Sequence, residues 1–143
     1  MKERCPNASF YCRASLSNHR IDFTRKSSKR KCGVADIVKD NNSKVYGVIY
    51  RIDEMDLGKL DKHEGYVPQR DNNAYKRIEI IVFEEDNKEK PITAFTYEVV
   101  KKEFGKYKPN KEYKNLIATG AKFWKLPEDY INFLENIETI KDE

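Results

Sequence analysis

The sequence predicts an α+β fold, and three observations support this prediction. Segments rich in β-branched and aromatic residues, which are typical of strands, recur between residues 9 and 99. One short helical pattern interrupts them after Ile52, and two more follow between residues 113 and 137. The length of 143 residues fits a single domain, residues 1–143.

Short strands are expected in the first part of the chain. Residues 9–14 and 21–24 predict two of them, separated by a turn around Ser17 and Asn18. Residues 33–38 predict another strand, in which Gly33 allows a close approach of the backbone to a ligand. The polar residues 40–43 then predict a hairpin-type turn.

Residues 44–52 have β-branched or aromatic side chains at most positions and little polar face. This composition predicts a strand in the centre of the sheet. Asp53 after it is a suitable N-cap for a short helix. Leu57 and Leu60 are three residues apart and predict an inward stripe, whereas Asp56 is expected to face water.

This helix is expected to end near His63, because Gly65 can adopt the left-handed turn that closes a helix. Glu64 then lies at the negative end of the helix dipole, where a carboxylate is disfavoured. A carboxyl group held closer to neutrality suits proton transfer. The alternative is a solvated glutamate in a turn.

The rest of the chain predicts a strand pair and two helices. Residues 77–83 and 92–99 read as antiparallel strands joined by a charged turn, and residues 104–111 read as a loop. In the helices, the inward positions are predicted to be Tyr113, Leu116, Ile117, Gly120, Ala121 and Trp124, followed by Tyr130, Phe133, Leu134 and Ile137. Pro127 is expected to open the second helix.

Composition limits the classes of function. Charged residues make up 36% of the chain, yet the formal net charge is only +4 with both signs mixed, which does not favour nucleic acid as a partner. No apolar run approaches the roughly 18 residues of a membrane helix, and no signal-peptide core follows Met1. We therefore expect a cytoplasmic protein without a membrane partner.

The cysteines and histidines offer little support for a metal site. Cys5, Cys12 and Cys32 form no C-x-x-C pair, and with His19 and His63 their spacing lacks the pairing of zinc ligands. Free and mostly buried thiols in a reducing compartment are the better interpretation.

Residues 25–31 contain five basic residues of seven. They lack the interleaved aromatic residues that stack on bases, so an RNA-contacting module is the weaker hypothesis. A solvated loop is the simplest interpretation, and attraction of an anionic substrate is the next.

Several motifs together resemble the γ-glutamylcyclotransferase-like family. The central motifs are Val45-Tyr46-Gly47-Val48-Ile49-Tyr50, Leu57-x-x-Leu60-Asp61 and Glu64-Gly65-Tyr66. Others in family order are Arg4-Cys5-Pro6-Asn7-Ala8, Arg13-Ala14, Asp22-Phe23-Thr24, Cys32-Gly33-Val34-Ala35-Asp36-Ile37, Tyr75, Gly120-Ala121 and Leu126-Pro127-x-x-Tyr130. The resemblance covers nearly the whole chain, and it is the combination that is specific.

The resemblance implies the site residues. Glu64 matches the catalytic acid/base of the family. The substrate-binding residues that it implies are Gly33, Val34, Gly65, Tyr66, Tyr75 and Tyr113. For Tyr75, donation to the substrate and a place in the core are about equally expected. Cys32 replaces what is often a glycine in the family, which narrows the expected pocket.

The resemblance also implies a small mixed β-barrel flanked by helices, and an enzyme that cyclises a γ-glutamyl group to 5-oxoproline with release of an amine. The partner is then a small-molecule γ-glutamyl substrate, and no metal or organic cofactor is required. The alternative is a non-catalytic small-molecule-binding domain of the same fold.

One family landmark does not occur in this sequence. Family members begin with an apolar strand that ends in a Tyr-Gly-Ser-Asn turn, whereas this sequence begins Met1-Lys2-Glu3-Arg4, which resembles the end of the following helix. We therefore expect either a longer protein or a chain with half of the site. Because an uncovered strand edge recruits partners, a homodimer is also expected.

Overall fold

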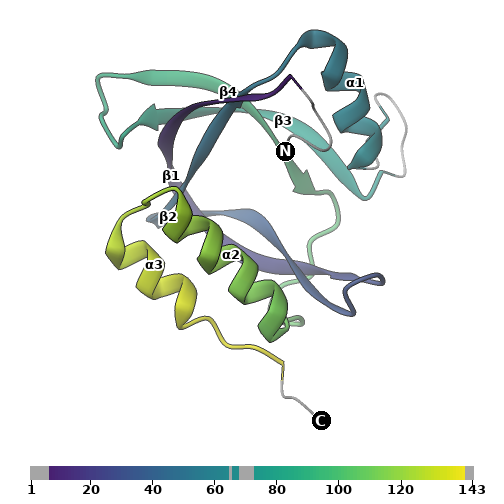
Figure 1. Cartoon of the computed structure of the whole chain (residues 1–143). Helices are drawn as coiled ribbons and strands as arrows, with labels where there is room; N and C mark the ends of the chain where they lie inside the picture. Colours follow the sequence, from purple (N-terminus) through teal and green to yellow (C-terminus); the bar gives the residue numbers. More distant parts are fainter. Residues whose placement is uncertain (1–6, 65, 68–72, 141–143) are drawn as a thin grey trace. The chain divides into compact units, whose positions relative to one another are not determined.

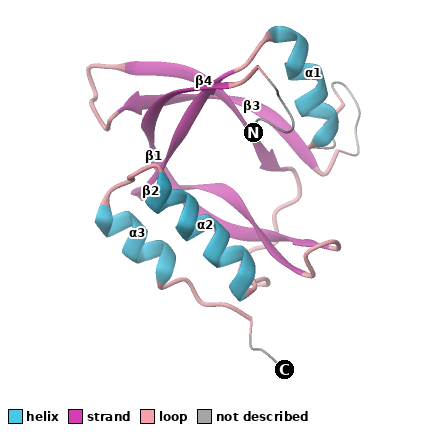
Figure 2. Cartoon of the chain, in the orientation of Figure 1, coloured by secondary structure: helices cyan, strands magenta, loops and turns pink. Residues whose placement is uncertain are grey.

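The structure is a computed structural model, and it describes residues 7–64, 66–67 and 73–140 (Figure 1). The strands are β1 (Ser9–Ser27), β2 (Cys32–Arg51), β3 (Tyr75–Glu84) and β4 (Pro91–Val99). The helices are α1 (Glu54–His63), α2 (Lys111–Phe123) and α3 (Glu128–Glu135) (Figure 2). These elements confirm the α+β fold class.

The strands form one antiparallel sheet in the order β2-β1-β3-β4. β3 and β4 pair along their length, from Tyr75 opposite Val99 to Phe83 opposite Pro91, as the sequence predicts. β1 pairs with β3 where Ala14 lies opposite Glu84.

The expected mixed β-barrel is wrong, because the sheet is antiparallel and open, and β2 and β4 are its two edge strands in the described part of the chain. The expected central position of residues 44–52 is wrong for the same reason, since residues 44–51 belong to β2. Except for the exposed Arg51, the residues of this segment are half-buried. Strand-forming residues are favoured wherever their side chains pack on a half-buried sheet surface, and an edge strand offers such a surface as well as a central strand does.

The two turns expected within the first strands are also absent. β1 continues through Ser17 and Asn18, where Asn18 takes a positive φ of 60°, and β2 continues through residues 40–43. Asp40 still makes turn-like hydrogen bonds, accepting from the Asn42 amide at 3.2 Å and the Ser43 hydroxyl at 2.8 Å. The hydrogen bonds typical of a turn are therefore present, but residues 40–43 remain part of the strand.

The chain divides into two compact units. Unit 1 contains Met1–Ser15 and Val48–Lys101, and unit 2 contains Leu16–Gly47 and Lys102–Glu143. The long strands β1 and β2 contribute to both units. The single domain expected for residues 1–143 stays a prediction.

Unit 2 is built around the two C-terminal helices. α2 and α3 pack together (Figure 1). Their buried core is Ala118, Ala121, Leu126 and Leu134, with Ile21 of β1 and Tyr46 of β2 against it. Leu116 and Phe133 were expected to face inward, but 55% and 49% of their surfaces are exposed. Ala118, which was not expected to face inward, lies in the core.

In unit 1, α1 begins and ends where the sequence predicts. Asp53 occupies the N-cap position in an extended conformation, and Leu60 packs with Ala8 in a buried cluster. Asp56 does not face water as expected, since only 4% of it is exposed. The physical reason is that Asp56 lies four residues before Leu60, so the two share one helix face.

Within the described residues, none of the helices is both long enough and apolar enough to cross a membrane.

Candidate active site

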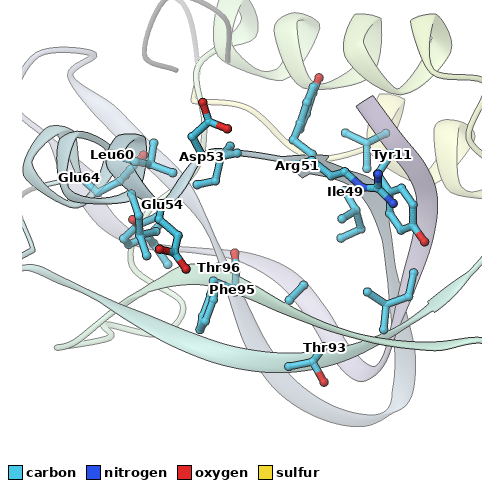
Figure 3. Close-up of a pocket in the computed structure, with 17 residues that line it drawn as sticks. Tyr11, Ile49, Arg51, Asp53, Glu54, Leu60, Glu64, Thr93, Phe95 and Thr96 are labelled. Carbon is cyan, nitrogen blue, oxygen red and sulfur yellow. The ribbon is translucent and has the colours of Figure 1, made fainter. Parts of the chain in front are cut away.

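A cavity of about 670 Å³ lies within unit 1 (Figure 3). Its walls are Tyr11 of β1, residues 48–51 of β2 with the following residues 52 and 53, three residues of α1, the C-cap Glu64, and residues 92–97 of β4. Three carboxylic acids line it, namely Asp53, Glu54 and Glu64. In Figure 3, Glu54 and Glu64 lie at one end of the cavity, and Arg51 and Tyr11 lie at the other.

Glu64 is the C-cap residue of α1 and is half-buried. Its backbone amide donates to the Leu60 carbonyl at 3.0 Å, which continues the helical hydrogen bonding to the last turn. The Tyr66 amide donates to the Asp61 carbonyl at 2.8 Å. These bonds fix the backbone that carries the Glu64 carboxyl group to the cavity.

Asp61, which belongs to the Leu57-x-x-Leu60-Asp61 motif, lies near the end of α1. Only 6% of it is exposed, and each carboxylate oxygen has its own partner. Arg77 of β3 donates from Nη1 to Oδ2 at 2.5 Å, and the Tyr97 hydroxyl of β4 donates to Oδ1. Asp61 therefore joins the end of α1 to both strands of the β3–β4 pair.

Tyr97 lines the cavity together with Glu64. Burial raises the pKa of the Tyr97 phenol well above its ordinary value, and the hydrogen bond to Asp61 raises it further. The phenol is therefore neutral at physiological pH, and its proton is committed to Asp61.

Arg77 also packs against aromatic rings. Its guanidinium carbon lies 5.3 Å from the Phe95 ring centre and 5.9 Å from that of Tyr66. Tyr66, which was expected to bind substrate, therefore has its ring against the cation that holds Asp61. Aromatic packing of this kind restricts the guanidinium to one orientation.

The other predicted residues of unit 1 lie outside the described cavity lining. Tyr75 is half-buried at the start of β3, opposite Val99. Tyr66 and Tyr75 are not among the described residues that line the cavity. Gly65, the remaining predicted residue of this unit, falls outside the described residues.

Gly33 and Val34 belong to β2 within unit 2. The Gly33 amide donates to the Lys108 carbonyl at 2.8 Å. A Cβ atom at this position would lie 2.8 Å from Tyr107 Cβ and 3.1 Å from the Lys108 nitrogen. A close approach does require glycine here, as the sequence analysis expected, but the atoms that approach it are those of the chain's own loop.

Tyr113 of α2 is also part of unit 2. Its hydroxyl accepts a hydrogen bond from the Ala35 amide at 2.9 Å, and the guanidinium of Arg30 lies 4.8 Å from its ring centre. Arg30 comes from the basic segment 25–31, so part of that segment has a partner within unit 2. Glu64 and Tyr113, both predicted as site residues, thus belong to different units.

The described residues contain no group of three or more His, Cys, Asp or Glu that is arranged to hold a metal ion. Cys12 and Cys32 are buried free thiols. Burial raises the pKa of the Cys12 thiol, and the nearby Glu84 and Glu85 raise it further. This thiol is protonated and poorly nucleophilic at neutral pH.

These features define an α+β protein with a cavity that is lined in part by carboxylic acids at the two ends of a helix. The sequence and the structure were compared with those of known proteins. Residues 44–134 match the sequence model of the AIG2-like family. The chain is 32% identical over 139 residues to γ-glutamylcyclotransferase of Bos taurus and to that of Homo sapiens. Each match covers 94% of this chain and 70% of the relative.

A solved structure of a γ-glutamyl cyclotransferase has the same fold, with a TM-score of 0.84 and 28% sequence identity. It matches 99% of this chain, which covers 81% of that structure. The chain therefore belongs to the γ-glutamylcyclotransferase-like family.

Proposed function

We propose that this protein is an enzyme of the γ-glutamylcyclotransferase type, which cyclises a γ-glutamyl group to 5-oxoproline and releases an amine. The observation that carries the proposal is Glu64, which matches the catalytic position in the family's motif and lines the cavity of unit 1. The relatives named γ-glutamylcyclotransferase support the same activity.

In the proposed reaction, the α-amino nitrogen of the γ-glutamyl group attacks its own γ-carbonyl carbon. The new C–N bond closes a five-membered ring, and the bond from that carbon to the leaving nitrogen breaks. Holding the substrate curled makes the attack intramolecular, which supplies much of the rate through effective molarity.

Glu64 would act as the general acid/base. An ammonium has no lone pair for attack, so Glu64 takes one of its protons and passes it to the leaving nitrogen as the amine departs. The ring nitrogen loses a second proton as the lactam forms, and the released amine takes up that proton to leave as an ammonium. Main-chain amides near the reacting carbonyl would stabilise the oxyanion. Gly33, Val34, Gly65, Tyr66, Tyr75 and Tyr113 are the substrate-binding residues that the family resemblance proposes.

The test is release of 5-oxoproline from a panel of γ-glutamyl amino acids, γ-glutamyl amines and glutathione. Wild-type protein is compared with Glu64→Gln, which keeps the shape of the side chain but removes the base. We expect kcat to fall by a factor of about 10² to 10⁴, with an unchanged unfolding midpoint, because general acid/base catalysis contributes on that order.

Two matched variants locate the effect. Glu54→Gln changes another carboxyl group in the same cavity, and Glu79→Gln changes an exposed glutamate of β3. Both are expected to keep most of the wild-type rate. An active Glu64→Gln variant, or a loss in Glu54→Gln alone, would contradict the assignment to Glu64.

A non-catalytic binding domain of the same fold is the alternative. It predicts binding of γ-glutamyl compounds without release of 5-oxoproline by the wild-type protein. Any turnover that depends on Glu64 excludes it. The cytoplasmic location and the homodimer stay predictions.

A further inference from the structure

We propose that the Tyr97 hydroxyl oxygen accepts a hydrogen bond from the substrate's α-ammonium group, and that Asp61 and Arg77 are the residues that position it for this. The proposal rests on the proposed function, because it assigns a binding partner to the amino group that the reaction uses. It makes Tyr97 a residue that selects substrates with a free α-amine.

The Tyr97 hydroxyl has a limited capacity for hydrogen bonds. A tyrosine hydroxyl has one proton to donate and lone pairs that accept. The Tyr97 proton is directed to Asp61 Oδ1. What Tyr97 can offer to a molecule in the cavity is therefore an acceptor.

The charge of Asp61, which accepts the Tyr97 proton, is compensated within the same cluster. Asp61 is buried, and a buried carboxylate without compensation is costly. Arg77 compensates its charge with a 2.5 Å bond to Oδ2, the oxygen that Tyr97 does not use. Arg77 is itself held by the rings of Phe95 and Tyr66. Both oxygens of Asp61 thus have a fixed partner, and the phenol proton of Tyr97 is directed to one of them.

The proposed base, Glu64, lies near Asp61, the partner of the Tyr97 hydroxyl. Asp61 and Glu64 are three residues apart at the end of α1, which puts them on neighbouring positions of one helix face. Tyr97 and Glu64 line the same cavity, and the charge of Glu64 contributes to the raised pKa of Tyr97. In the proposal, an amino group bound between these two residues gives a proton to Glu64 and a hydrogen bond to the Tyr97 oxygen.

The chemistry of the substrate then selects the partner. An ammonium has three N–H donors and accepts nothing, so it fits Tyr97 as well as Glu64. The substrate's carboxylate and carbonyl oxygens are acceptors, so they cannot form a hydrogen bond with the Tyr97 oxygen, whose proton is directed to Asp61. When Glu64 removes one proton, the bond to Tyr97 keeps the amine in place for attack.

The experiment compares two ligands that differ in the α-amino group alone: γ-L-glutamyl-L-alanine and N-glutaryl-L-alanine. Their dissociation constants are measured by calorimetry in the Glu64→Gln background, which prevents turnover, with and without Tyr97→Phe. We expect Tyr97→Phe to weaken binding of the γ-glutamyl compound about 10- to 100-fold, the usual range for a hydrogen bond to a charged group. Binding of the glutaryl compound is expected to change less than about twofold, within the scatter of such measurements.

Two controls sharpen this result. Tyr130→Phe also deletes a mostly buried tyrosine hydroxyl, but in unit 2, and it should change neither dissociation constant. Asp61→Asn keeps the size of the Asp61 side chain but lets its amide donate to Tyr97, so the loss should again be confined to the γ-glutamyl compound. With Glu64 intact, Tyr97→Phe should lower kcat/KM for γ-glutamyl-alanine by a similar factor.

Equal weakening of both ligands by Tyr97→Phe, or no weakening of either, would overturn the role of Tyr97. If the wild-type protein still released 5-oxoproline in that case, the proposed function would stand without it. A wild-type protein that binds neither compound and releases no 5-oxoproline would overturn both.

Discussion

Two buried aspartates, one in each unit, have almost the same surroundings. Asp61 in unit 1 holds Arg77 and the Tyr97 hydroxyl, and Asp36 in unit 2 holds Lys102 and the Thr24 hydroxyl. At Asp36 both donors reach the same oxygen, Oδ2, at 2.6 Å.

The two clusters differ in what the hydroxyl faces. Thr24 is completely buried, so its bond to Asp36 is enclosed within unit 2. Tyr97 is one of the residues that line a cavity. A carboxylate, a cation and a hydroxyl thus form a structural cluster where they are enclosed, and a candidate binding group where one member reaches a cavity.

The largest expected effect on stability is removal of the cation from the enclosed cluster. Lys102→Met should lower the free energy of unfolding by about 3–5 kcal/mol, because breaking a buried ion pair from one side leaves a costly buried charge. The Asp36 side chain is fully buried, whereas 9% of the Asp61 side chain is exposed. Arg77→Met should therefore cost less. Urea unfolding of both variants measures this, and an equal or greater loss in Arg77→Met would contradict the contrast.

The next effect separates the two hydroxyls. Thr24→Val removes the hydroxyl bonded to Asp36 at a nearly constant volume, and it should cost about 1–3 kcal/mol of stability. At a temperature where this variant is folded, its kcat/KM for γ-glutamyl-alanine should equal that of the wild type. Tyr97→Phe is expected to lower kcat/KM instead. The comparison fails if Thr24→Val changes the kinetics as strongly as Tyr97→Phe.

The smallest effect is seen at alkaline pH, and it compares tyrosines of the two units. Burial raises the pKa of Tyr130 to about 12, although a hydrogen bond with the Tyr46 backbone opposes this. The folded state then holds the phenol proton more tightly than the unfolded chain does, whose tyrosine pKa is about 10. The stabilisation is complete below pH of about 10 and is lost as the pH rises toward 12.

Tyr130→Phe should therefore unfold with a shallower decline of stability in this pH window than the wild type. Tyr97→Phe should also flatten the decline, because the pKa of Tyr97 is raised as well, by burial and by Asp61. Urea midpoints between pH 9 and 12 provide the measurement. If the stability of Tyr130→Phe declined as steeply as that of the wild type, the pKa of Tyr130 would not be raised in the folded state.

Local patterns in the sequence predict a large part of the fold. The charged turn between residues 84 and 91 and the alternating residues around it predict the pairing of β3 with β4, which the register confirms. The limits of α1 follow from Asp53 at its start and from the pattern that ends at His63. The motif around Glu64 indicates the candidate site because its residues are close together in the sequence.

Tertiary contacts decide what those patterns leave open. Arg77 and Tyr97 lie 16 and 36 residues from Asp61 in the sequence. A local sequence pattern carries no information on pairs so far apart. The continuation of β2 through residues 40–43 and its position at the sheet edge also depend on which strands pair. Asp56 is buried because of what packs on its helix face, and Gly33 is covered by a distant loop at Tyr107 and Lys108.

The sequence by itself therefore determined the element types, the ends of α1 and the candidate base, since propensities and capping act over a few residues. The tertiary structure alone decided which strands form the edges, which aspartates are buried, and which tyrosines line the cavity. The physical reason is that burial and hydrogen-bond partners are set by residues distant in the chain, whose approach depends on the packing of whole elements.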